Sequence, residues 1–125
     1  MSILPSRCRK YLLDQNIVFE EIDGDQKAVI LKDYPVPFGK LDAEKADFLI
    51  QLPKGYPDVR PDMFYVTPWL KLVSGGGYPK AADVPLQFLG RNWQRWSRHQ
   101  DQWRPGIDGI WTMLRRIDAA LEAAA

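Results

Sequence analysis

The sequence lacks several features that whole classes of protein require. Its single cysteine, Cys8, cannot form an intrachain disulfide, and one cysteine with one histidine cannot build a typical zinc site. No apolar run approaches the roughly 18 residues that cross a membrane. The N-terminal stretch MSILPSRCRKYLLDQ carries charges where a signal peptide needs apolar residues. We therefore expect a cytoplasmic protein without a membrane partner or a structural metal.

A surplus of charge of one sign is also missing. The 125 residues include 17 lysines and arginines against 16 aspartates and glutamates, so the net charge is +1. This balance gives no general attraction to nucleic acid or to acidic membranes, and a partner must be recognised locally. The length fits a single domain, residues 1–125, which buries roughly two thirds of the surface of its unfolded chain.

Apolar periodicity predicts an α+β fold. Apolar residues recur at spacings of three and four after Pro105, which suits a first helical turn, and Asp108 can complement the helix dipole. Segments rich in β-branched and aromatic residues predict antiparallel strands between two helices. The predicted elements are a helix over 4–13 with Asn16 as its stop, a meander of about four strands over 17–22, 27–34, 46–52 and 63–67, and the C-terminal helix.

A long loop is predicted at about residues 68–85, PWLKLVSGGGYPKAADVP. Three successive glycines and several prolines disfavour regular structure through most of this stretch. Loops of this length in a folded domain are usually functional or disordered. Two interpretations stay open, an arm or flap beside a site and a tolerated surface insertion.

Two motifs carry a resemblance to a known family. The segment LPKGYPDVRPDMFYVTP (52–68) resembles the part of the ubiquitin-conjugating (UBC) fold with a Tyr-Pro pair before the fourth strand. The segment DQWRPGIDGIWTMLRRIDAAL (101–121) is similar to its Trp-x-Pro element and following helix. LPxGYP, Trp-Ser-Arg-His and WRPG in this order resemble the prokaryotic ubiquitin-conjugating-like family E. The resemblance covers most of the chain except 69–92.

The resemblance implies a UBC-like fold with an irregular active-site region between the meander and the C-terminal helix. It implies a carrier role in a bacterial ubiquitin-like conjugation pathway. The implied partners are a ubiquitin-like protein, a ubiquitin-activating-like enzyme and an isopeptidase of the same pathway. Acyl transfer of this kind needs no metal or organic cofactor.

The chain departs from the family of eukaryotic enzymes at two places. Thr67 is followed by PWLKL, where those enzymes have a His-Pro-Asn triplet whose asparagine steadies the oxyanion. The residues before Trp103 contain no cysteine, although the catalytic cysteine of those enzymes lies there. Thioester chemistry at the usual position is therefore excluded.

Ser97 is the candidate nucleophile, six positions before Trp103. A serine can accept an acyl group as an oxyester if a base removes its proton and donors stabilise the oxyanion. His99 is the candidate base, Asp101 could orient it or receive the proton of an incoming amine, and Asn92 is the candidate oxyanion donor. Cys8 is disfavoured, because the resemblance places the N-terminal helix away from the active site.

Three functional hypotheses remain open from the sequence. The first is an acyl transferase without the usual cysteine, with Ser97 carrying the oxyester. The second is a non-catalytic UBC-fold module that binds a ubiquitin-like protein or its activating enzyme. The third rests on RNWQRWSRHQDQWR (91–104), whose mixed arginines and tryptophans are typical of single-strand nucleic-acid platforms. Near-zero net charge argues against the third, and we expect Trp93, Trp96 and Trp103 to serve in packing.

Overall fold

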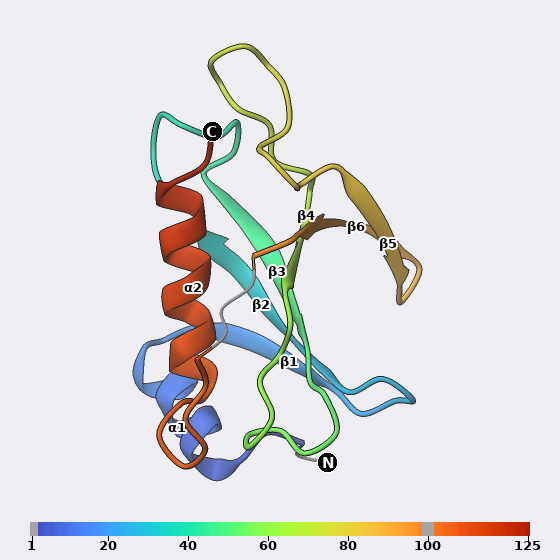
Figure 1. Cartoon of the computed structure of the whole chain (residues 1–125), viewed down its shortest axis with the longest axis vertical. Coiled ribbons are helices and arrows are strands. Elements are labelled where there is room, and N and C mark those ends of the chain that lie inside the picture. The colour runs from blue at the N-terminus through green and yellow to red at the C-terminus, as the bar shows by residue number, and fades with distance from the viewer. Residues whose placement is uncertain (1–2, 99–101) are drawn as a thin grey trace.

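Two helices and a six-stranded antiparallel sheet make up the described part of the chain (Figure 1). The computed structural model describes residues 3–98 and 102–125. The strand order is β1-β2-β3-β4-β6-β5. The elements are α1 (Ser6–Asp14), β1 (Val18–Ile22), β2 (Ala28–Pro35), β3 (Lys45–Gln51), β4 (Phe64–Thr67), β5 (Val84–Phe88), β6 (Arg91–Trp96) and α2 (Ile110–Glu122). The predicted α+β class is confirmed.

The sheet contains two strands more than the sequence predicted. Strands β1 to β4 form the expected meander, in which each strand pairs with the next. The prediction of about four strands is wrong because β6 pairs with β4 and β5 pairs with the other side of β6. Strand β5 contains Pro85, which lacks an amide donor and is tolerated at the edge of a sheet. Its sequence therefore resembles that of a loop.

A two-residue turn joins β5 to β6. Phe88 pairs with Arg91 across the turn, and Leu89 and Gly90 between them have positive φ angles of 52° and 72°. Positive φ at both central positions is the type I′ geometry, which matches the twist of antiparallel strands. Glycine adopts this conformation without strain, whereas leucine is strained by its Cβ atom. After this turn β6 pairs with β4. Ser97 directly follows Trp96, the last residue of β6.

Helix α1 ends as the sequence predicted. Asn16 has φ 58°, and its amide donates to the Leu13 carbonyl at 3.1 Å. The next amide, that of Ile17, donates to the Leu12 carbonyl at 3.0 Å. This pair of bonds around a left-handed residue is the Schellman motif, which asparagine tolerates better than most residues.

Helix α2 begins later than predicted because Asp108 closes a separate turn. The carboxylate of Asp108 accepts bonds from the Arg104 amide at 2.8 Å and from the Thr112 hydroxyl at 3.0 Å. Residues 105–107 form this turn and the helix starts at Ile110, so the placement of Pro105 in the first helical turn is wrong. Bonds from the Arg104 side chain and amide, and from Thr112, outweigh burial and lower the pKa of Asp108 to about 2.

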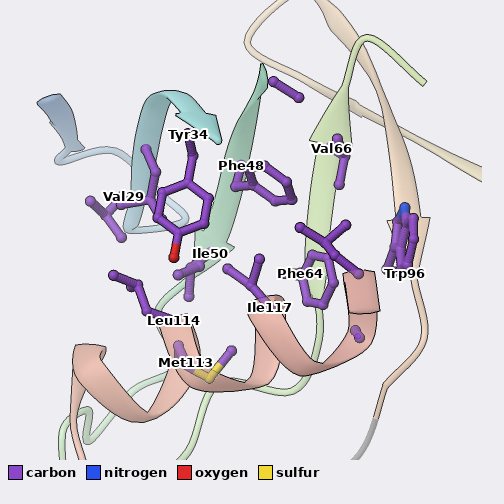
Figure 2. Close-up of a cluster of buried hydrophobic side chains, with 14 of the residues drawn as sticks. Val29, Tyr34, Phe48, Ile50, Phe64, Val66, Trp96, Met113, Leu114 and Ile117 are labelled. Carbon is purple, nitrogen blue, oxygen red and sulfur yellow. The ribbon is translucent and has the colours of Figure 1, made fainter. Parts of the chain in front are cut away.

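Residues of both helices join a core on one face of the sheet that is rich in aromatic rings, and Figure 2 shows the part beneath α2. The rings of Phe64 and Trp96 stack with centroids 5.6 Å apart, and side chains of α2 lie against this layer. A smaller cluster around Trp93 packs on the opposite face. Trp93 and Trp96 are both fully buried, so their predicted role in packing is confirmed. Core side chains labelled in Figure 2 are Val29, Tyr34, Phe48, Ile50, Val66, Met113, Leu114 and Ile117.

Buried Gln94 holds both ends of the loop between β4 and β5. Its side-chain oxygen accepts bonds from the Leu70 amide at 2.8 Å and from Trp96 Nε1 at 2.9 Å. Its side-chain nitrogen donates to the Leu70 carbonyl at 3.0 Å and to the Ala82 carbonyl at 2.8 Å. One strand residue therefore determines where the loop leaves β4 and where it approaches β5.

The first half of this loop is also bound to the β2–β3 connection. The Val73 amide donates to the Lys40 carbonyl at 2.9 Å, and the Asp42 amide donates to the Lys71 carbonyl at 3.0 Å. An isolated β-bridge pairs Leu41 with Leu72 of the loop. The residues just before the glycine-rich stretch are therefore held against the β2–β3 connection.

Candidate functional site

Ser97 lies in a hollow formed by three segments of the chain. The hollow has a volume of about 350 Å³. Ser97 is half-buried, and its backbone amide donates to the Ala81 carbonyl at 3.0 Å. This bond joins the end of β6 to the loop between β4 and β5, and the C-terminal end of α2 completes the hollow. The lining residues are Lys80, Ala81, Ser97, Arg98, Ala123 and Ala125.

Two cationic side chains line the hollow beside Ser97. The Arg98 guanidinium lies 5.0 Å from the centroid of the Trp96 ring, and its Nη1 donates to the Ser97 carbonyl at 3.1 Å. Burial lowers the pKa of Arg98 from its ordinary value, although an arginine stays charged at neutral pH. Lys80 is exposed. Among the described residues, no aspartate or glutamate side chain lines the hollow.

The residue bound to Ser97 has an unfavourable backbone conformation. Ala81 has φ 56°, in the left-handed region that residues with a Cβ atom rarely adopt. Its neighbour Ala82 is held by the Gln94 side chain, and the Lys80 amide donates to the Ala125 carbonyl at 3.0 Å. Strain of this kind persists only where surrounding contacts determine the backbone, and it is common at functional sites.

The structure does not bring Asn92 to Ser97. Asn92 is exposed near the start of β6, where it pairs with Gln87 of β5, and its carbonyl accepts a bond from Trp69 Nε1 at 3.0 Å. Ser97 is five positions further along the extended chain, a length of up to about 16 Å. The predicted His99 and Asp101 lie outside the described residues, so their roles as base and orienting carboxylate stay predictions.

Cys8 lies elsewhere, on the side of α1 that faces the core. Its side chain is 1% exposed, and Sγ is 3.4 Å from the Tyr56 hydroxyl. Burial, followed by this contact, raises the pKa of Tyr56 above its ordinary value. Helix α1 meets the first turn of α2 through the rings of Tyr11 and Trp111, 5.9 Å apart. The Ser97 hollow is at the other end of this 13-residue helix, about 20 Å away. A buried thiol at this position is not accessible to a macromolecular acyl donor.

The two motifs that carry the family resemblance contact each other. Trp103 donates from Nε1 to the Pro57 carbonyl at 2.9 Å, and its ring lies 6.4 Å from that of Tyr56. The Arg116 guanidinium of α2 lies over Trp103, 5.6 Å from the ring centroid. Trp103 thus connects the Tyr-Pro turn to the C-terminal helix, in line with its predicted packing role.

The tryptophans of β6 offer no stacking surface for bases. Trp93 and Trp96 are fully buried, and each ring is already covered by an arginine. The guanidinium of Arg91 lies 4.7 Å from the centroid of Trp93, and that of Arg98 covers Trp96. A single-strand platform needs accessible rings, so this geometry counts against nucleic-acid binding.

A meander followed by a hairpin, with the Tyr-Pro and Trp-x-Pro elements in contact, is consistent with an E2-like fold. Comparison with protein-family models matches residues 4–124 to prokaryotic E2 family E. The chain therefore belongs to prokaryotic E2 family E, as the sequence motifs predicted. No curated protein and no solved structure matches it.

The described residues contain neither a membrane-spanning helix nor a cluster of metal ligands. No helix in the described ranges is long and apolar enough to cross a membrane. Over the same ranges, histidine, cysteine, aspartate and glutamate side chains form no group of three that could hold a metal ion.

The residues that surround Ser97 were not predicted from the sequence. Lys80 and Ala81 belong to a loop with no periodicity, and nothing local indicates that they approach Ser97. Arg98 could have been found as a cation adjacent to the candidate nucleophile. Gln94 also carried a signal, because residues two apart on a strand share a face and Trp96 was expected to be buried.

Proposed function

We propose that this protein is an acyl carrier of a bacterial ubiquitin-like conjugation pathway and holds the acyl group as an oxyester on Ser97. An activating enzyme would use ATP to activate the C-terminus of a ubiquitin-like protein. That acyl group would pass to Ser97 and then to an acceptor amine or hydroxyl. Membership of the E2-like family supports the carrier role and the general class of partners.

The observation that carries the proposal is the position of Ser97. It lies in the stretch before Trp103 where E2 enzymes have their cysteine, and it lines a hollow with two cations. Attack by a hydroxyl on an acyl carbon develops negative charge on the carbonyl oxygen, which nearby cations stabilise. The proton of the hydroxyl needs an acceptor, and His99 is the proposed base.

A second candidate function is supported by what the chain lacks. It has neither a cysteine at the usual position nor the His-Pro-Asn triplet. A UBC-fold module without a nucleophile would bind a ubiquitin-like protein or its activating enzyme and present it to another enzyme. An isopeptidase of the same pathway is a further partner of either function.

Intact-mass measurement tests the first function against the second. The protein is incubated with its candidate activating enzyme, ubiquitin-like protein and ATP. We expect an adduct that resists thiol reductant, is cleaved by mild alkali and is absent in Ser97→Ala. Ser97→Cys should convert the linkage to one that thiol reductant cleaves, because the acyl group would then be a thioester.

Two variants serve as controls. Ser74→Ala removes an exposed serine in the glycine-rich stretch and should leave the adduct unchanged. Cys8→Ala should also form the adduct, after correction for the stability that is lost with a buried side chain. Binding of the partners without any adduct on wild type would refute the carrier function and support the module.

A further inference from the structure

The Ser97 hollow lacks the group that stabilises the oxyanion in eukaryotic E2 enzymes. No asparagine follows β4 in a His-Pro-Asn triplet, and Asn92 is up to about 16 Å along the strand from Ser97. An acyl transfer at Ser97 would still pass through a tetrahedral intermediate with a negative oxygen. Some other group in the hollow must face that charge.

Arg98 is held where its charge lies beside the Ser97 backbone. Its guanidinium lies over the buried Trp96 ring and donates a hydrogen bond to the Ser97 carbonyl. These two contacts fix the position of the guanidinium. Two contacts of this kind reduce the rotamers available to a long side chain. An arginine positioned before the reaction does not need to reorganise when charge develops.

Lys80 belongs to another segment that lines the hollow, the loop between β4 and β5. Its own amide is bonded to the Ala125 carbonyl, and the carbonyl of the next residue, Ala81, is bonded to the Ser97 amide. The backbone that carries Lys80 is thus bound on both sides, to the end of α2 and to the end of β6. The strained conformation of Ala81 is the cost of holding the backbone at this point.

We infer that Lys80 and Arg98 together stabilise the oxyanion formed at Ser97, in place of the missing asparagine. This inference rests on the proposed carrier function. It also gives the loop between β4 and β5 a role, which is to bring Lys80 to the nucleophile. Gln94, which holds Ala82 and Leu70, is then a positioning residue for the site.

In this step one bond to the acyl carbon forms and another breaks. Ser97 Oγ forms a bond to the acyl carbon of the activated C-terminus, and its proton passes to a general base. The carbonyl oxygen carries the negative charge between Lys80 and Arg98. The bond from the acyl carbon to the leaving group, an adenylate phosphate or a thiolate on the activating enzyme, then breaks, and that group leaves with the electron pair. The ester carbonyl is restored.

The test is the rate at which the alkali-labile adduct forms in a single turnover with excess activating enzyme. Lys80→Ala should slow formation at least tenfold, and Arg98→Gln by about 100-fold, the loss typical of one oxyanion donor. Lys80→Arg and Arg98→Lys retain the charge and should recover most of the rate. Lys71→Ala is the matched control, because Lys71 is an exposed lysine of the same loop whose ammonium lies over Tyr78, outside the hollow. Urea unfolding of each variant corrects for any loss of folded protein.

The outcomes separate this inference from the function on which it rests. If wild type forms no adduct on Ser97, the carrier function fails and the inference fails with it. If wild type forms the adduct and both Lys80→Ala and Arg98→Gln form it at the wild-type rate, the carrier function stands and the inference is overturned. Loss of rate in Lys80→Arg as severe as in Lys80→Ala would also overturn it, because a role for positive charge predicts rescue.

Discussion

Replacing Gln94 with leucine should strongly destabilise the fold and loosen the loop beside Ser97. The side chain makes four hydrogen bonds, to the amide and carbonyl of Leu70, to the Ala82 carbonyl and to Trp96 Nε1. Gln94, Leu70, Ala82 and Trp96 are all 0% exposed, so leucine would leave buried polar groups without partners. At about 1 kcal/mol for each bond, less some gain from burying leucine, we expect a loss of about 3 kcal/mol.

This loss is a large fraction of the 5–15 kcal/mol typical of the stability of a folded domain. Urea unfolding followed by tryptophan fluorescence measures it, and Gln87→Leu on the exposed face of the neighbouring strand is the matched control. Hydrogen exchange should also show earlier loss of protection at the Leu70 and Ser97 amides, which depend on the loop. A change in the free energy of unfolding below about 1 kcal/mol for Gln94→Leu would show that the Gln94 side chain does not hold the loop in place.

Two further predictions concern the β5–β6 turn and the start of α2. Leu89→Asn should stabilise the protein by about 0.5–1 kcal/mol, because asparagine tolerates the positive φ of a type I′ turn better than leucine. The pKa of Asp108 is lowered to about 2 from an ordinary value of 3.8, so its contribution to stability is present above about pH 4 and is lost as the pH falls towards 2. Asp108→Asn should remove this part of the acid dependence of unfolding.

Each of these predictions has a clear contrary result. Urea unfolding in which Leu89→Asn is less stable than wild type would show that the exposed leucine contributes more by packing than it costs by strain. Acid titration of wild type and Asp108→Asn compares their free energies of unfolding at pH 5 and at pH 2.5. If the two proteins lose stability in parallel, the bonds from Arg104 and Thr112 to the carboxylate do not account for the pKa of Asp108.

The contact between the Tyr-Pro and Trp-x-Pro motifs and the candidate site lie on different parts of the molecule. The contact between Trp103 and Pro57 lies near the start of α2, whereas the Ser97 hollow includes the end of that helix. The Tyr-Pro and Trp-x-Pro residues therefore build the framework, whereas Ser97 and Arg98 of the Trp-Ser-Arg-His element line the hollow. Ser97 depends on the framework only for its position at the end of β6.

Much of the fold follows from local sequence alone. Apolar residues at helical spacing identified both helices, and richness in β-branched and aromatic residues identified the first four strands, because each type of element favours its own spacing and side chains. Asn16 was predicted as a helix stop because its short polar side chain tolerates a left-handed backbone. Ser97 was found because the family resemblance places the catalytic cysteine in the stretch before Trp103, where this chain has that serine. These are properties of short stretches and need no knowledge of the tertiary structure.

Only the tertiary structure decided which segments meet at Ser97. Hydrogen bonds across the sheet place β6 beside β4, and β5 was missed because an exposed edge strand with a proline lacks the usual alternation. Lys80 precedes Ser97 by 17 residues and Ala123 follows it by 26, so no local pattern could join them. Their approach depends on Gln94, on the left-handed Ala81 and on the packing of α2 against the sheet. Contacts between distant residues arise from the whole set of burial and hydrogen-bonding requirements, which the chain satisfies together only when it is folded.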